Sequence, residues 1–372
     1  MQTETIVVKI GTSSLTDGSG RLDPSLLEGH VASLIRLKRS GFRVVLVSSG
    51  AIAAGFHDLG LSGRPCTLAG KQAAAAVGQV HLVERYRKAF TAFGESCGQV
   101  LLTRSDFDQR TRYLNALNTL NYLLERGCVP VINENDSVAV DEIRWGDNDT
   151  LAAMVAGLLQ ARWLLLITDT DGVYTANPMD HPDAEKIPHL NRVDEALLNR
   201  LDDSRSAFGT GGMRSKLTAA RKAARIGVRV YIGTARESAG WMHDVIDGKG
   251  TGTYLDALPR RVSRKEQWIA AHACPRGRLT VDGGAARALL ESGGSLLPCG
   301  VVDVTGRFAA GEVVEVTGPG QLSLGRGVCR YSADLLRQVK GLQSHEALRL
   351  APGCPEEVIH RDDWVRTGAE SD

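Results

Sequence analysis

The sequence predicts an α/β protein, in which a mostly parallel sheet is sandwiched by helices and followed by a small, mainly β domain. Between residue 6 and about residue 235, runs of branched aliphatic residues alternate with helical patterns. Such alternation is typical of parallel sheets that are covered on both faces. From about Gly248 to Gly277 the pattern gives way to Gly, Pro and charge. The 372 residues also exceed the roughly 250–300 that one hydrophobic core usually organises, so we expect two domains.

In the first part of the chain, turn and capping residues mark the ends of the expected elements. Asp23 and Pro24 begin a helix that runs to Ser40 and is closed by Gly41, because Asp caps free amides, Pro fits a first turn and Gly permits a left-handed exit. Further helices are expected at Tyr113–Arg126 and Leu217–Ile226. The predicted strands are Ile6–Ile10, Val44–Val47, Gln99–Thr103, Val129–Ile132, Trp163–Thr168 and Val228–Ile232. Ligands of such sheets bind beyond the carboxyl ends of the strands, so the turns there are the expected functional sites.

The second part is expected to be a small β module with one helix, Ala285–Glu291. Its predicted strands are Leu279–Val281, Val301–Val304, Glu312–Thr317 and Gln321–Leu324. The expected organisation is a first domain at 1–255, a linker at 256–275, the β module at 276–355 and a polar, loose tail at 356–372.

Composition excludes several classes of protein. With 43% hydrophobic and 23% charged residues, the chain resembles neither disordered nor fibrous proteins. Lys plus Arg number 44 against 43 Asp plus Glu, so no overall charge attracts nucleic acid or a membrane. The longest apolar stretch, Leu151–Thr168, contains Gln160 and Arg162 and therefore predicts a buried helix and strand rather than a membrane span.

The cysteines and histidines predict a cytoplasmic protein without a caged transition metal. The seven cysteines form no C-x-x-C pair, which is typical of reduced thiols rather than of a disulfide framework or a zinc site. The nine histidines form no close pair at ligand spacing. The 41 glycines instead indicate many tight loops in which the backbone meets ligand.

Two lysines are candidate phosphate-binding residues. Lys9 lies near the end of a strand, directly before a Gly-Thr-Ser-Ser turn whose amides can face an anion. A strand-end lysine in solvent is an equally good interpretation of that fragment. Lys216 follows a glycine-rich segment and lies at a predicted helix start, where the helix dipole also favours an anion. The segment is Gly209, Thr210, Gly211, Gly212, Met213, Arg214, Ser215, Lys216; it lacks P-loop spacing, and a flexible surface loop is the alternative.

Polar residues also follow other strands. Asn133 and Asp136 come after one strand, and Asn148 and Asp149 stand just before a predicted helix. These side chains suit an ammonium group and other polar substrate atoms, although Asp147 or Asn148 can also simply cap the helix. The turn Ser49, Gly50, Ala51 offers amides and a hydroxyl for a carboxylate, or is an ordinary strand-to-helix turn. Thr168 and Asp169 begin either a nucleotide-binding edge or a plain Asp-Gly turn.

Taken in order, five motifs resemble those of the amino-acid-kinase family. They are Val8–Ser13, Ser49–Gly55, Ile132–Asp136, Gly146–Asp149 and Gly209–Met213, and the resemblance extends to about residue 255. The segments Gly294–Val301 and Phe308–Val313 resemble a PUA domain that spans about Arg276 to Leu350.

The resemblance implies transfer of the ATP γ-phosphoryl group to the γ-carboxylate of L-glutamate, at the start of proline synthesis. It implies that Lys9, Lys216 and Asp149 are catalytic, and that Mg²⁺ accompanies ATP, with ligands left unassigned. It places Ser49, Gly50, Ala51, Asn133, Asp136 and Asn148 at glutamate, and Lys9, Thr168, Asp169 and Thr210–Lys216 at ATP. It further implies feedback inhibition by proline, a homo-oligomer, and association with glutamate-5-semialdehyde dehydrogenase.

Two alternatives stay open at this point. One is another kinase of the same family, such as an N-acetylglutamate or aspartate kinase, against which the PUA-like module argues. The other is an RNA-binding protein, since PUA domains commonly contact RNA. The module offers nine Arg or Lys against seven Asp or Glu between Pro275 and Pro355, a weak footprint for RNA. The basic run Arg260–Lys265 lacks interleaved aromatics and is interpreted as a solvated linker.

Overall fold

The computed structural model describes residues 3–138, 148–178, 180–201, 212–235, 240–258, 264–269 and 275–366. They fall into two compact units. Unit 1 comprises residues 1–106 and 113–261, and unit 2 comprises residues 107–112 and 262–372. Each unit is described by itself.

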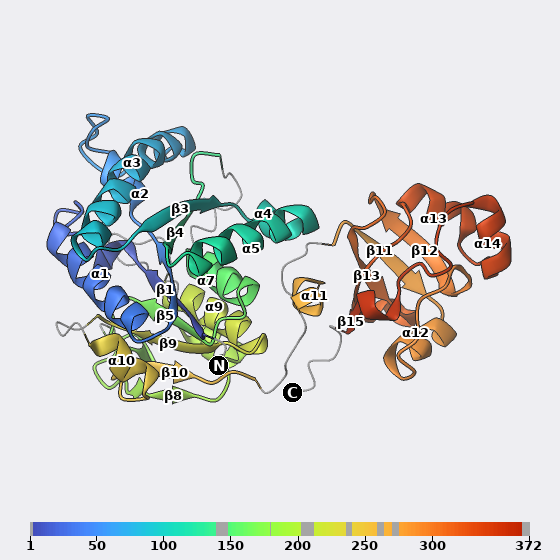
Figure 1. The fold of residues 1–372 in the computed structure, drawn as a ribbon. Coiled ribbons are helices and arrows are strands. Elements are labelled where there is room, and N and C mark those ends of the chain that lie inside the picture. The colour runs from blue at the N-terminus through green and yellow to red at the C-terminus, as the bar shows by residue number, and fades with distance from the viewer. Residues whose placement is uncertain are drawn as a thin grey trace. The chain divides into compact units, whose positions relative to one another are not determined.

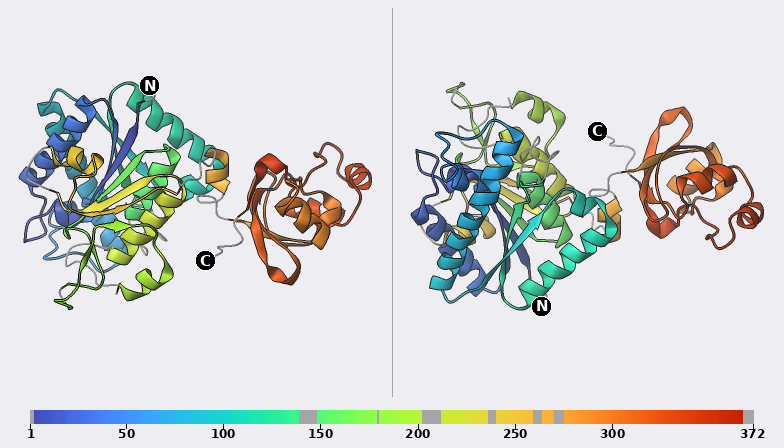
Figure 2. Two further views of the ribbon diagram at one scale, coloured as in Figure 1. Left: turned by 90° about the horizontal axis from the view of Figure 1, so that it is seen from below. Right: turned by 90° about the horizontal axis from the view of Figure 1, so that it is seen from above.

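Unit 1 is built on an eight-stranded sheet with helices on both faces (Figures 1 and 2). The strands follow the order β3-β4-β2-β1-β5-β9-β10-β8. The six strands from β3 to β9 are mutually parallel, and β10 is antiparallel to β9. The strands of the sheet are β1 (Thr5–Ile10), β2 (Arg43–Ser48), β3 (Cys97–Leu102), β4 (Val129–Glu134), β5 (Trp163–Ile167), β8 (His189–Leu190), β9 (Arg229–Gly233) and β10 (Thr253–Leu255). A short hairpin pairs β6 (Val173–Tyr174) with β7 (Lys186–Ile187).

The helices of this part of the chain confirm the predicted alternation. They are α1 (Pro24–Arg39), α2 (Ala51–Gly55), α3 (Leu68–Ala92), α4 (Ser105–Asp108), α5 (Arg110–Glu125), α7 (Asn148–Leu158), α8 (Glu195–Arg200), α9 (Met213–Arg225) and α10 (Trp241–Ile246), with a 3-10 turn at Thr12–Ser14. Asp23 caps α1 by accepting from the Ser25 amide, and Gly41 has the positive φ of +94° that a left-handed exit needs. Helix α9 begins at Met213, one turn earlier than the sequence predicted.

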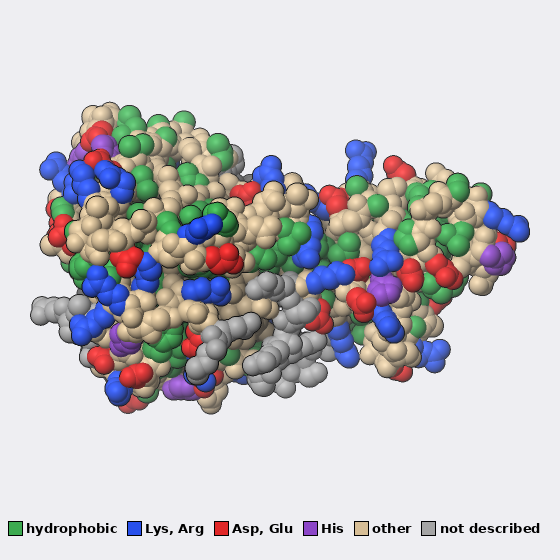
Figure 3. All heavy atoms as spheres, in the orientation of Figure 1, with side chains coloured by type: hydrophobic (Ala, Val, Ile, Leu, Met, Phe, Trp, Pro, Cys, Tyr) green, Lys and Arg blue, Asp and Glu red, His purple; other side chains and the backbone are tan. Residues whose placement is uncertain are grey.

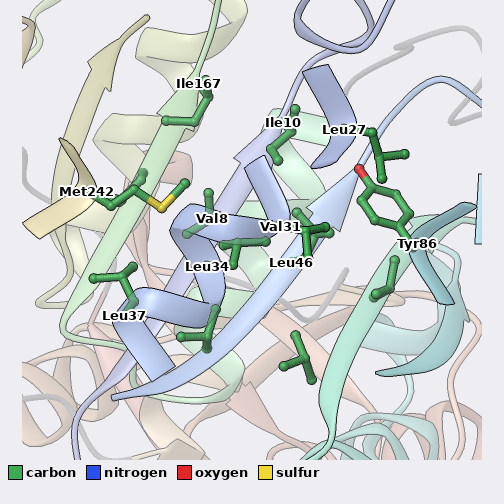
Figure 4. Close-up of a cluster of buried hydrophobic side chains, with 14 of the residues drawn as sticks. Val8, Ile10, Leu27, Val31, Leu34, Leu37, Leu46, Tyr86, Ile167 and Met242 are labelled. Carbon is green, nitrogen blue, oxygen red and sulfur yellow. The ribbon is translucent and has the colours of Figure 1, made fainter. Parts of the chain in front are cut away.

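The side chains of β1 alternate between the two faces of the sheet. Ile6, Val8 and Ile10 join the core that α1, α3 and α10 cover, where Val8 and Ile10 lie with Val31 and Leu34 of α1 (Figure 4). Because successive side chains of a strand point to opposite faces, Lys9 faces the other side. Helix α7 packs against β1 and α9 on that side. A cation in a fully buried strand is thereby placed between the sheet and two helices.

Unit 2 contains a five-stranded sheet of order β12-β11-β13-β14-β15. The strands are β11 (Gly277–Val281), β12 (Val301–Gly306), β13 (Val313–Thr317), β14 (Ser323–Val328) and β15 (Trp364–Arg366), and the helices are α11 (Arg264–Gln267), α12 (Gly283–Leu290), α13 (Ala333–Val339) and α14 (Ser344–Leu350). The mainly β module is confirmed, but the expectation of a single helix is wrong, since α13 and α14 also pack on its core through Leu336, Val339 and Ala347.

The expectation of a loose tail from residue 356 is wrong for residues 356–366. Val358 and Ile359 are fully buried, and β15 pairs antiparallel with β14. The predicted linker also contains α11 and the buried Trp268 and Ile269. A short apolar pair among polar residues is too weak a signal in the sequence, yet Val358 and Ile359 join the core of unit 2, and β15 extends its sheet.

Candidate functional site

Two lysines and one carboxylate meet at the carboxyl end of β1. Lys9 Nζ lies 2.7 Å from Asp149 Oδ1, and Lys216 Nζ lies 3.2 Å from Asp149 Oδ2. The side chains of Lys9, Lys216 and Asp149 are 6%, 9% and 0% exposed. Lys9 therefore does not project into solvent. Among the described residues, these three side chains carry two positive charges and one negative charge in a nearly dry site, a balance that favours a further anion.

Helix ends add to this attraction. Asp149 lies in the first turn of α7, and Lys216 in the first turns of α9. The residue before α9, Gly212, is extended at φ −83° and ψ −176° and provides no side-chain cap. The first amides of a helix carry partial positive charge and suit a phosphate. Met213, Arg214 and Ser215 form that turn, whereas Thr210 and Gly211 lie outside the described residues.

Beside the charge cluster, polar groups from the ends of β2 and β4 and from α3 and α7 form a network. Asn148 Nδ2 donates to the Ser48 carbonyl at 3.1 Å, to Ser49 Oγ at 3.0 Å and to Asn133 Oδ1 at 3.0 Å. Asn133 Nδ2 donates to Gln79 Oε1 of α3 at 2.8 Å. The structure thus brings together Ser49, Asn133 and Asn148, which are distant in sequence.

The turn after β2 depends on two glycine features. Gly50 precedes α2 with φ +103°, a left-handed conformation that side chains other than glycine adopt with strain. Gly55 of α2 crosses Gly78 of α3 in backbone contact: a Cβ at Gly78 would lie 1.9 Å from the Ala51 carbonyl oxygen. This crossing fixes the start of α2, including Ala51, against α3.

A cleft of about 330 Å³ opens beside the network. Its lining includes Ala51, Gln79 and Asp136, and its volume lies at the lower end of the roughly 300–1,000 Å³ typical of small-molecule sites. Burial raises the pKa of Asp136 to about 6, opposed by the positive charge of Arg64. A half-buried carboxylate in a cleft is a suitable partner for an ammonium group.

Thr168 and Asp169 lie directly after β5, the strand beside β1. Thr168 Oγ1 donates to Asp169 Oδ1 at 3.0 Å, and the Thr168 amide donates to the Gly233 carbonyl. The two residues are therefore held by hydrogen bonds to each other and to β9 at the end of the strand that pairs with β1.

Within the described residues, no group of three or more His, Cys, Asp or Glu side chains is arranged to hold a metal ion. Asp149, the buried carboxylate nearest the anion site, is already engaged by two lysines. None of the described helices combines the length and the apolar character that crossing a bilayer requires.

Sequence reasoning missed Gln79 and Tyr86 of α3. Gln79 holds Asn133, and Tyr86 OH lies 2.8 Å from Ser48 Oγ, so α3 supports the network at two points. The available signal was the small-residue run that ends in Val77-Gly78-Gln79, because such runs allow close helix approach. Nothing in the local pattern shows that this helix lies beside β2 and β4.

Comparisons with known proteins agree with this geometry. The model of the amino acid kinase family matches residues 4–234, and the model of the PUA domain matches residues 277–350. A glutamate 5-kinase from Geobacillus kaustophilus is 49% identical over 374 residues, covering 100% of this chain and 99% of that protein. One from Bacillus cereus strain G9842 is 48% identical over 366 residues, covering 98% and 100%. One from Shouchella clausii is 47% identical over 371 residues, covering 100% and 99%.

Proposed function

The chain belongs to the amino acid kinase family, and on that premise we propose that it acts as a glutamate 5-kinase. It transfers the γ-phosphoryl group of ATP to the γ-carboxylate of L-glutamate and gives γ-glutamyl phosphate, the first step of proline biosynthesis. The observation that carries the phosphotransfer is the buried cluster of Lys9, Asp149 and Lys216.

The reaction needs charge neutralisation and positioning rather than a general base. A glutamate γ-carboxylate has a reference pKa of about 4.3 and is already ionised at neutral pH. Both reactants are anionic, and charge spreads over the phosphoryl group during transfer. Lys9 and Lys216 supply positive charge, and Asp149, which contacts one lysine with each carboxylate oxygen, orients both ammonium groups before substrate binds.

The remaining residues divide between the two substrates. Thr168, Asp169 and the segment from Thr210 to Lys216 would hold ATP, and Ser49, Gly50, Ala51, Asn133, Asp136 and Asn148 would hold glutamate. Mg²⁺ enters as part of the MgATP substrate, since this ion is commonly held by phosphate oxygens and water with few protein ligands. That is compatible with a described site whose central carboxylate is already paired with lysines.

A hydroxamate assay tests the proposal. Hydroxylamine traps the acyl phosphate, so hydroxamate should form only when ATP, Mg²⁺ and L-glutamate are all present. N-acetylglutamate and aspartate serve as competing substrates. Preferential reaction of either one would replace the proposed substrate.

The same enzyme is proposed to be cytoplasmic, to form homo-oligomers and to be inhibited by proline. Millimolar proline should lower hydroxamate formation, and unchanged rates would exclude this inhibition. Association with glutamate-5-semialdehyde dehydrogenase would protect the labile acyl phosphate. If the two enzymes associate, glutamate should be converted through both reactions faster when they are mixed than when a barrier keeps them separate.

RNA binding by the PUA domain is the second candidate function. The module carries nearly balanced charge, and in the view of Figure 3 its blue and red side chains are interspersed. Salt-dependent RNA binding at physiological ionic strength, without glutamate-dependent ATP consumption, would favour it over the kinase.

A further inference from the structure

Gln79 of α3 lies between the amide network and the cleft. Its Oε1 accepts a hydrogen bond from Asn133 Nδ2 at 2.8 Å. The same side chain lines the cleft together with Ala51 and Asp136. Gln79 is therefore in a position to act on the network and on a bound ligand.

Backbone groups fix which way these amides face. The Glu134 N–H donates to Asn133 Oδ1 at 2.9 Å, and a backbone N–H can only donate. Asn133 must therefore present its oxygen to Glu134 and its Nδ2 to Gln79. Because Nδ2 can only donate, Gln79 must answer with Oε1, which leaves its Nε2 as the second atom of the amide. This assignment follows from the network and not from an arbitrary choice of amide orientation.

Within the part of the chain that the structure describes, no protein group accepts a hydrogen bond from Gln79 Nε2. The bond to Asn133 is the one hydrogen bond of the Gln79 side chain found among the described residues. The network also has an unused acceptor. The Ser48 carbonyl can only accept, so Asn148 faces it with Nδ2. Asn148 Oδ1 is then buried without a partner in the described part of the chain. A buried acceptor such as Asn148 Oδ1 is costly unless a ligand or water donates to it.

The cleft thus pairs an amide donor with a carboxylate, and this combination matches an α-amino acid. Ammonium and carboxylate groups lie on one carbon of such a substrate, and Gln79 and Asp136 both line the same cleft. We propose that Gln79 is a substrate-contacting residue whose Nε2–H donates to the α-carboxylate of L-glutamate while Asp136 holds the α-ammonium. This inference rests on the proposed function, from which the amino-acid substrate is taken.

The decisive variant is Gln79→Glu. It keeps the length of the side chain and an acceptor for Asn133, but it replaces the NH₂ donor with an anionic oxygen. The KM for L-glutamate should rise about 10- to 100-fold, the scale of one lost hydrogen bond to a charged group. The KM for ATP and the kcat at saturating glutamate should stay at the wild-type values.

A substrate analogue separates recognition from support of the fold. 4-Aminobutyrate keeps the ammonium and the distal carboxylate of glutamate but lacks the α-carboxylate. As an inhibitor in the hydroxamate assay, 4-aminobutyrate should have an inhibition constant that is no larger in Gln79→Glu than in the wild type. Gln72→Glu, on the same helix but outside the lining of the cleft, is the matched control and should leave both ligands unaffected.

The outcomes are distinct. An unchanged KM for L-glutamate in Gln79→Glu, or equal weakening of L-glutamate and 4-aminobutyrate, would overturn the role of Gln79. If the wild type forms no hydroxamate from L-glutamate, it is the proposed function that fails. Calorimetric titration with L-glutamate then tests Gln79 by itself, since Gln79→Glu should still bind this ligand more weakly than the wild type.

Discussion

Asp149→Asn should separate the structural role of the lysine cluster from its catalytic role. Asp149 has no exposed surface and contacts Lys9 and Lys216 at 2.7 Å and 3.2 Å. At an effective dielectric constant of about 20, each contact corresponds to about 5–6 kcal/mol of Coulomb attraction. Desolvation of all three groups offsets most of it. Replacing the carboxylate that both lysines contact removes the negative charge from this buried cluster, a loss of about 3–5 kcal/mol in the free energy of unfolding.

Differential scanning fluorimetry measures this loss. For a unit of this size, about 3 kcal/mol lowers the Tm by on the order of 10 °C. MgATP supplies a new anion to the same lysines, so its stabilising shift should be at least as large in Asp149→Asn as in the wild type. Turnover in the hydroxamate assay should nevertheless fall by at least about 100-fold, because the two lysines are no longer preorganised.

Asp58→Asn is the matched control, since it removes a carboxylate from an exposed pair with His81 and should change neither Tm nor turnover measurably. Near-normal turnover in Asp149→Asn would refute the organising role. If Asp149→Asn lost both its activity and the rise in Tm that MgATP causes, the view that the lysines alone attract the phosphates would be refuted.

Three further predictions concern single side chains. Lys9→Ala and Lys216→Ala should each lower turnover by at least about 100-fold while circular dichroism stays that of the folded wild type, and near-normal turnover in either would contradict the assignment. The raised pKa of Asp136 is about 6, so the carboxyl is protonated at lower pH and loses its attraction for ammonium. The kcat/KM for L-glutamate should therefore fall about tenfold for each pH unit below pH 6, and Asp136→Asn should abolish this pH dependence. Gly78→Ala should destabilise unit 1 by about 1–3 kcal/mol in urea unfolding, because its Cβ would meet a backbone carbonyl of α2 at 1.9 Å. Gly29→Ala in α1 has open space around it and should be neutral or stabilising, so equal losses in both variants would contradict the crossing.

Much of unit 1 follows from local patterns. Each signal depends only on residues close to it in the chain, so it can be recognised in the sequence. These signals are the continuous apolar strands, the helix start at Asp23-Pro24 and the glycines that end helices. The rule that ligands bind at the carboxyl ends of parallel strands then selects the strand ends at which Lys9, Ser49, Asn133 and Thr168 lie. The residue types at those strand ends indicate phosphate and ammonium partners, but the choice of L-glutamate came from family resemblance.

Local sequence patterns do not predict elements that contain few apolar residues, or side chains whose partners are distant in the sequence. Val358, Ile359 and β15 lie in a polar segment and are structured because a core and a sheet edge already exist to receive them. Gln79 sits in the middle of a helix, far in sequence from every strand end, and nothing near it marks a site. Its role arises because α3 runs beside β2 and β4, where the backbone fixes the direction of each amide.

Hydrophobic periodicity and turn chemistry are local, so the sequence is enough to predict which residue types stand at the ends of which strands. Which of those residues meet depends on how distant segments pack. Strand period turns Lys9 away from the α1 core, and the starts of α7 and α9 bring Asp149 and Lys216 to it. A lysine near a strand end can lie in solvent or in a buried ion-pair cluster. Which of the two occurs depends on packing between segments that are distant in the chain.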